Sequence, residues 1–169
     1  MTGRSGQPKD RAAHTEDPMR EAVALTERIE FRWSNGPTVV AGYRRNGFLS
    51  VYFGEEPYYQ FDAAARLRRA RVGDRLFRTE GSRLAALTRV KEPAASLLVR
   101  HDLDPVELEE FRRMMLEQLR ALHDAVAGGQ IEVLRQVPPD APIVERLVRS
   151  FDAVLSAGGE LAPAINKVR

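Results

Sequence analysis

The chain has 169 residues, contains no cysteine and carries a formal net charge of +2. The lack of thiols excludes disulfide bridges, thiolate metal sites and cysteine nucleophiles, and it suits a reducing compartment. A charge so close to neutrality is not typical of a dedicated polyanion-binding protein, and no apolar run approaches the roughly 18 residues of a membrane span. We therefore expect a cytoplasmic protein without membrane contact, whose length is compatible with one domain.

The first part of the chain is polar and shows no apolar period, which predicts a disordered leader over residues 1–17. Asp17 followed by Pro18 is typical of a helix start, because aspartate caps free amides and proline suits the first helical position. We expect a brief helix at this point. Its candidate apolar residues are Met19, Ala22, Val23 and Leu25.

Residues 28–100 form short apolar and aromatic runs that are separated by turn residues such as SNGP, RNG, GEEP, VGD and EGS. Turns at intervals of about 8 to 12 residues predict an antiparallel meander. We count seven or eight strands, and a sheet of this size could curl into a partial barrel.

Helical periodicity begins after residue 100. Asp104, Pro105 and Glu107 form a capping box with proline at the first helical position, which predicts a helix over residues 105–127. Gly128 and its neighbour are expected to end this helix, because glycine is a frequent terminator.

The last part of the chain is predicted to hold one short strand and one helix. The stretch QIEVLRQVPP is compatible with the strand, and Asp140 is expected to cap a helix over residues 141–157, with a tail over residues 161–169. Both long helices carry an apolar stripe that must be buried. The prediction is an α+β fold in one domain over residues 18–160, with the sheet in 28–100 and two C-terminal helices packed on it.

An arginine-rich hairpin is predicted around the two-residue loop Gly73-Asp74. In this register Arg69 faces Arg78, and Arg71 lies on the same side of the sheet. Like charges placed directly opposite each other destabilise a sheet unless an anion or a carboxylate lies between them. The three arginines therefore indicate a partner of opposite charge.

A second hairpin is predicted around Asn46-Gly47, the strongest short-range hairpin signal in the chain. With a two-residue loop, Tyr43 and Tyr52 fall on one face, and Tyr58 joins them if the adjacent Tyr59 points into the core. The residues expected on the core side of this hairpin are Val40, Leu49, Val51 and Phe53.

The candidate binding face combines three tyrosines with three arginines, which suits single-stranded nucleic acid because bases stack on aromatic rings. Its residues are Tyr43, Tyr52, Tyr58, Arg69, Arg71 and Arg78. The alternative is that the acidic C-terminal helices cover this face, and the need to bury their apolar stripes favours this alternative. The acidic residues that could then meet the arginines are Glu109, Glu110, Glu117 and Asp124.

The sequence contains no phosphate-binding glycine loop, dinucleotide fingerprint, serine elbow or zinc-protease motif. His101 and Asp102 are a weak metal-binding candidate, because the neighbouring Asp104 already has a capping role. We identify no catalytic residue and expect no cofactor, and an enzyme stays possible only through residues that the fold brings together.

Three functions are compatible with these observations. The first is a non-catalytic binding or interaction module whose partner is another protein or a second copy of the chain. The second is a binder of single-stranded nucleic acid or another polyanion through the tyrosine and arginine face. The third is a carrier that holds a small ligand inside a curled meander. The first is the interpretation that we prefer.

Overall fold

The computed structural model describes residues 18–33, 36–45, 48–54, 56–91 and 96–163. Among them, nine antiparallel strands form one open sheet in the order β8-β7-β6-β5-β4-β3-β2-β1-β9. The strands are β1 (Glu27–Trp33), β2 (Thr38–Tyr43), β3 (Leu49–Phe53), β4 (Tyr58–Phe61), β5 (Leu67–Val72), β6 (Arg75–Glu80), β7 (Arg83–Lys91), β8 (Ser96–Asp102) and β9 (Ile131–Val137). The helices are α2 (Pro18–Val23), α3 (Pro105–Ala127) and α4 (Ile143–Ala157).

The predicted α+β fold with an antiparallel meander is confirmed. Strands β1 to β8 follow one another in the sheet, and β9 returns after α3 to pair with the free side of β1. The sheet does not close on itself into a barrel. No described helix is both long and apolar enough to cross a membrane.

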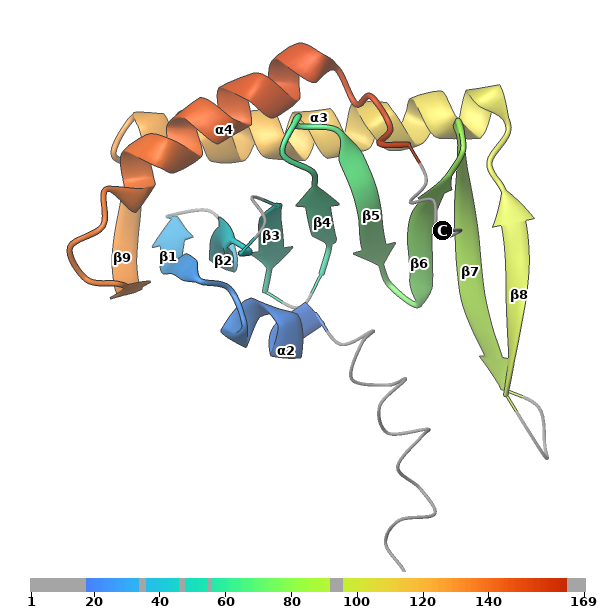
Figure 1. Cartoon of the computed structure of the whole chain (residues 1–169), viewed down its shortest axis with the longest axis horizontal. Coiled ribbons are helices and arrows are strands. Elements are labelled where there is room, and N and C mark those ends of the chain that lie inside the picture. Colours follow the sequence, from blue (N-terminus) through green and yellow to red (C-terminus); the bar gives the residue numbers. More distant parts are fainter. Residues whose placement is uncertain (1–17, 34–35, 46–47, 55, 92–95, 164–169) are drawn as a thin grey trace, which may run out of the picture.

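Both C-terminal helices lie across one face of the sheet, where they cover the main core (Figure 1). Phe111, Met115 and Leu119 of α3 are buried there with Ile29 and Phe31 of β1 in the same cluster. Complete burial of such a side chain stabilises the fold by roughly 1.5–3 kcal/mol relative to exposure. The prediction that the two helices pack on the sheet is therefore confirmed.

The start of α3 is as the capping box predicts. The Asp104 carboxylate accepts a hydrogen bond of 2.8 Å from the Glu107 amide, and the Glu107 carboxylate accepts one of 2.9 Å from the Asp104 amide. Two amides without partners in the helix are thereby satisfied. The helix spans Pro105–Ala127, the range expected from sequence.

The start of α4 differs from the prediction, because Asp140 does not cap it. The residue before the first turn is Pro142, which makes no capping hydrogen bond with its side chain. The Gln136 side chain instead donates to the carbonyl oxygens of Pro138, Pro139 and Ala141, and so orders the connection. Helical geometry begins only at Ile143, after this connection.

The short helix α2 lies on the sheet face opposite to α3 and α4 (Figure 1). Its residue Ala22 and the following Leu25 are buried against Tyr52 and Tyr58, whereas Val23 is exposed. The predicted leader, residues 1–17, and residues 164–169 of the predicted tail lie outside the described residues. The described start of that tail contacts the sheet through a bridge between residues 67 and 161.

Candidate interaction surface

The face of the sheet that carries α2 holds most of the predicted binding residues. The register of β5 and β6 is as predicted, with Arg69 opposite Arg78 and Arg71 opposite Leu76. The neighbouring pair, Tyr58 opposite Arg71, places Tyr58 on the same face. Five of the six predicted residues therefore share this outer face: Tyr52, Tyr58, Arg69, Arg71 and Arg78.

The placement of Tyr43 on this face was wrong. Tyr43 pairs with Leu49, and the Arg44 amide donates to the Phe48 carbonyl at 2.8 Å. Three residues, 45–47, therefore separate the last paired positions of the hairpin, where we predicted two. Because side chains alternate along a strand, a shift of one residue moves every side chain of β2 to the other face.

The same shift moves Val40, which we predicted in the main core, to the outer face opposite Tyr52. Asn46 and Gly47 themselves, around which the hairpin was predicted, lie outside the described residues. On the core side, the Tyr43 hydroxyl lies 2.9 Å from Ser150 Oγ of α4, and the Arg146 guanidinium lies 4.9 Å from the ring centre. Burial raises the pKa of Tyr43.

Helix α2 covers the outer face over β2, β3 and β4, and we call this part the covered region: Ala22, Leu25, Val40, Tyr52 and Tyr58. The side chains of Tyr52 and Tyr58 are 0% and 3% exposed, and their rings stack with centres 4.5 Å apart. Burial raises the pKa of both phenols. In this conformation neither ring is available for stacking with a base.

The carboxylate of Glu21 joins α2 to the sheet. It accepts hydrogen bonds from the Tyr58 hydroxyl at 2.9 Å and from Arg69 Nη2 at 2.5 Å, and it lies 3.5 Å from Arg44 Nη1. Gln60 Oε1 accepts a further bond of 3.1 Å from Arg69 Nε. The carboxylate expected beside these arginines is thus present, and it belongs to α2.

The expectation that the acidic C-terminal helices cover this face was therefore wrong, because α3 and α4 occupy the opposite face (Figure 1). The stripes of α3 and α4 pack where the sheet presents its larger apolar surface, including Val51 and Phe61. The six residues of α2 are enough to cover the smaller cluster around Tyr52. None of the four acidic residues named from sequence meets these arginines in the contacts that the structure describes.

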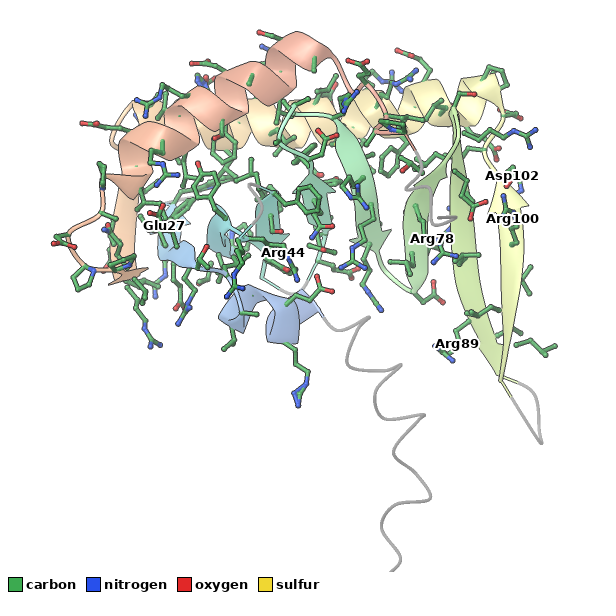
Figure 2. The ribbon with its side chains drawn as sticks, viewed as in Figure 1. Glu27, Arg44, Arg78, Arg89, Arg100 and Asp102 are labelled. Carbon is green, nitrogen blue, oxygen red and sulfur yellow. The ribbon has the colours of Figure 1, made fainter. Side chains whose placement is uncertain are left out.

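The outer face over β6, β7 and β8 is not covered by α2, as Figure 1 shows. We call it the open region: Leu76, Arg78, Leu87, Arg89, Leu98 and Arg100. A depression of about 160 Å³ lies here, lined in part by Leu76, Leu87 and Leu98. Arg78, Arg89 and Arg100 lie around this apolar strip on the same three strands (Figure 2).

Acidic side chains balance much of the charge of the open region. Arg100 lies 2.7 Å from the Glu80 carboxylate and 2.9 Å from the Asp102 carboxylate, and Arg83 lies 3.2 Å from Asp102. A hydrogen bond from Arg100 holds the pKa of Glu80 below its usual value. These pairs are exposed to solvent, and such pairs contribute little to stability.

Strand β8 is one edge of the sheet, and it carries three consecutive exposed apolar residues. Leu97, Leu98 and Val99 are 54%, 54% and 50% exposed. Side chains of a strand alternate between its faces, so three apolar residues in a row cannot all enter one core. This signal was present in SLLVR, but from the sequence we interpreted that run only as a strand.

His101 and Asp102, the weak metal-binding candidate, point to opposite faces of β8. His101 Nε2 lies 2.9 Å from the Glu107 carboxylate of α3, whereas Asp102 pairs with Arg83 and Arg100 on the other side. Among the described residues, no group of three histidine, aspartate or glutamate side chains is placed to hold a metal ion.

A second depression, of about 300 Å³, lies on the opposite face between the first half of α3 and the strands β5 and β6. Its apolar lining includes Phe77 and Phe111, and its charged residues are Arg75, Glu107 and Glu110. The Arg75 guanidinium lies 5.1 Å from the centre of the Phe77 ring. Charges of both signs at this site do not select one class of ligand.

The open region and the exposed residues of β8 are contiguous, because Leu98 belongs to both.

Comparison of the chain with models of protein families, with curated proteins and with solved structures gave no match.

Proposed function

We propose that the protein is a non-catalytic interaction module that binds a protein partner through β8 and the adjoining open region. The observation that carries this proposal is the run Leu97, Leu98 and Val99, each about half exposed on the edge of an open sheet. Exposed, apolar edge strands promote pairing with other chains, and natural proteins usually protect them. A run of this kind is therefore best explained by a partner that pairs with it.

The chemistry of such an edge suits a partner that adds a strand. The free side of an edge strand presents amides and carbonyls that can bond to an extended segment, while its side chains select the partner. Complete burial of a leucine or valine side chain contributes roughly 1.5–3 kcal/mol, so each half-exposed residue of this run could add about half as much. Apolar burial and backbone hydrogen bonds would act at the same place.

The alternative of nucleic-acid binding has less support. Tyr52 and Tyr58 are buried under α2, and Arg69 is bound to Glu21. In the open region, Glu80 and Asp102 lie beside the arginines and would repel phosphate groups. Binding through the predicted tyrosine and arginine face stays a prediction, and it would require α2 to leave the sheet.

The small-ligand alternative also has less support, because the open sheet encloses no interior and the depression beside α3 carries charges of both signs. The cytoplasmic location stays a prediction.

Site-specific photo-crosslinking tests the proposed function. A photoreactive amino acid replaces Leu98 in one variant and Val23 in a control, since Val23 is an exposed apolar residue of α2 outside the proposed surface. We expect a protein adduct at position 98 that is absent at position 23. The cross-linked partner, once purified, should bind the unmodified chain, and Leu98→Lys should weaken this binding at least tenfold.

Equal adducts at both positions, or a purified partner that binds Leu98→Lys as well as the unmodified chain, would contradict the proposal. Adducts at position 98 that contain nucleic acid rather than protein would favour the alternative.

A further inference from the structure

We propose that the partner at β8 is a second copy of the chain, and that two β8 strands pair antiparallel about a two-fold axis. This inference rests on the proposed function, because it assigns the occupant of the same edge. The two sheets would continue into each other across the axis. The geometry of the backbone, the apolar run and the charges of β8 each support this arrangement.

The backbone of β8 has one side free for such pairing. The Leu103 amide donates to the Leu84 carbonyl at 3.0 Å, which continues the register that pairs β7 with β8. In an antiparallel ladder, residues alternate between those that bond to the neighbour and those whose amide and carbonyl point away. The backbone groups of Ser96, Leu98 and Arg100 therefore point away from β7, and within the described chain β8 has β7 as its one neighbouring strand.

The free backbone groups restrict how two copies can pair. Residues whose backbone groups point away from β7 must lie opposite residues of the same kind in the second copy. Each allowed register therefore places Ser96, Leu98 and Arg100 opposite residues whose backbone groups also point outward. In one register, Leu98 lies opposite Leu98 of the second copy. Leu97 then lies opposite Val99 of the second copy, and the whole apolar run is matched with itself.

The neighbouring registers are less favourable. One places Leu98 opposite Arg100 and Leu97 opposite His101, so that apolar side chains face polar ones. The other places Leu98 opposite Ser96 of the second copy, and Val99 then lies opposite a residue outside the apolar run. Cross-strand pairs of like character stabilise a sheet, which favours the register centred on Leu98.

Charge is compatible with the same register. Arg100 lies opposite Ser96 of the second copy, so the two arginines do not face each other across the axis. Within each chain, Arg100 keeps its contacts with Glu80 and Asp102. Like charges directly opposite would destabilise the pair, and this arrangement avoids them.

Both faces of the joined sheet would gain apolar contact. On the outer face, Leu98 extends the strip formed with Leu76 and Leu87, and the strips of the two copies meet at the axis. On the other face, Leu97 and Val99 would cover their counterparts. Figure 1 shows that β7 and β8 extend away from α3, which leaves the β8 edge accessible.

Symmetry favours β8 pairing with β8 over β8 pairing with β9, the other edge of the sheet. An isologous contact uses the same surface on both copies and closes after two, whereas a contact between different edges can continue into a filament. Val133 and Leu134 of β9 are also exposed, so a head-to-tail arrangement has to be tested.

Sedimentation of the purified chain tests the oligomeric state. We expect a reversible monomer and dimer equilibrium that shifts with concentration. Leu98→Lys places two lysines opposite each other at the axis, and it should raise the dissociation constant at least tenfold. The matched control is Leu134→Lys, which makes the same substitution on the β9 edge and should leave the dimer unchanged. Circular dichroism checks that both variants fold.

Disulfide trapping tests the register, and the chain is suited to it because it contains no cysteine. Leu97 and Val99 of the two copies would form a pair without backbone hydrogen bonds, with Cα atoms about 4.5 Å apart. This separation suits a disulfide. A mixture of Leu97→Cys and Val99→Cys chains should form a mixed disulfide on mild oxidation, much faster than either variant alone.

Three results would overturn the inference. They are a chain that stays monomeric at every concentration, a dimer that Leu98→Lys leaves intact, and a dimer that is lost in Leu134→Lys. A disulfide that forms equally fast in each single variant would overturn the register. If the chain is monomeric but position 98 cross-links to a different protein, the proposed function survives without the second copy; if position 98 cross-links to nothing, both fail.

Discussion

The covered region and the open region lie on the same face of one sheet, yet only the covered region is buried under a helix. Tyr52 and Tyr58 are almost fully buried under α2, whereas Leu98 is 54% exposed. A helix of six residues makes this difference, because it reaches β2 and β3 but not β6 to β8. Apolar and arginine-rich strands therefore do not by themselves indicate a binding surface, because a covering element such as α2 can bury them.

The arginines of the two regions show the same contrast. Arg69 is held by Glu21 and Gln60, next to the buried Tyr58. Arg100 has two acidic neighbours as well, but its contacts are exposed to solvent. Contacts of the first kind hold one arrangement in place, whereas exposed pairs can exchange with a partner's groups at little cost.

The largest expected effect is the loss of an aromatic ring from the covered region. Tyr52→Ala should lower the free energy of unfolding by about 3–5 kcal/mol, because it removes a fully buried ring and its stacking contact with Tyr58. Urea denaturation measures this change. A loss below about 1 kcal/mol would show that α2 does not bury the ring in solution.

The second-largest expected effect is the destabilisation of the covered region at alkaline pH. Burial raises the pKa of Tyr52 and Tyr58, so the folded protein keeps these protons above pH 10, where the unfolded chain releases them. The unfolded state then binds fewer protons, and stability falls as the pH rises past about 10. The two residues together should lower the free energy of unfolding by about 3 kcal/mol per pH unit in that range.

Urea titrations at several alkaline pH values measure the slope of the whole protein, to which Tyr43 and Tyr59 add because burial also raises their pKa. The difference between the unmodified chain and Tyr52→Phe isolates one residue and should be about 1.4 kcal/mol per pH unit. Tyrosinate absorbance measures the ionisation of the tyrosines in the folded protein directly. Ionisation of Tyr52 or Tyr58 near pH 10 in the folded protein would show that the region is open.

Removal of the carboxylate that joins α2 to the sheet should have a smaller effect. Glu21→Ala should cost about 1–3 kcal/mol, because Tyr58 and the partly buried Arg69 lose a charged hydrogen-bond partner. A double-mutant cycle with Arg69→Ala isolates the pair energy. Strictly additive effects would mean that the contact contributes nothing.

The smallest expected effect lies in the open region. Leu98→Ala should change the free energy of unfolding of the monomer by no more than about 0.5 kcal/mol, because the side chain is half exposed. Urea denaturation at low protein concentration measures it. A loss as large as that of Tyr52→Ala would show that Leu98 belongs to the core and is no binding residue.

The features that were predicted correctly depend on local interactions. The pairing of Arg69 with Arg78 follows from a two-residue loop at Gly73-Asp74, and the start of α3 follows from the hydrogen bonds of Asp104 and Glu107. The hairpin between β2 and β3 differs from the prediction, because one additional loop residue reverses the face of Tyr43. The loop signal marks a turn, but packing on both faces selects the register.

Alternation and capping act over a few residues, and they are enough to predict the antiparallel meander, the two long C-terminal helices and the grouping of Tyr52 and Tyr58 with the arginines of β5. Three other features depend on contacts between distant segments: α3 and α4 cover the other face, Glu21 reaches Arg69, and β8 remains an edge. A local pattern does not predict these contacts, because both faces of the sheet carry apolar rows. Which helix covers which row depends on the relative size of the surfaces, and no local pattern encodes that size.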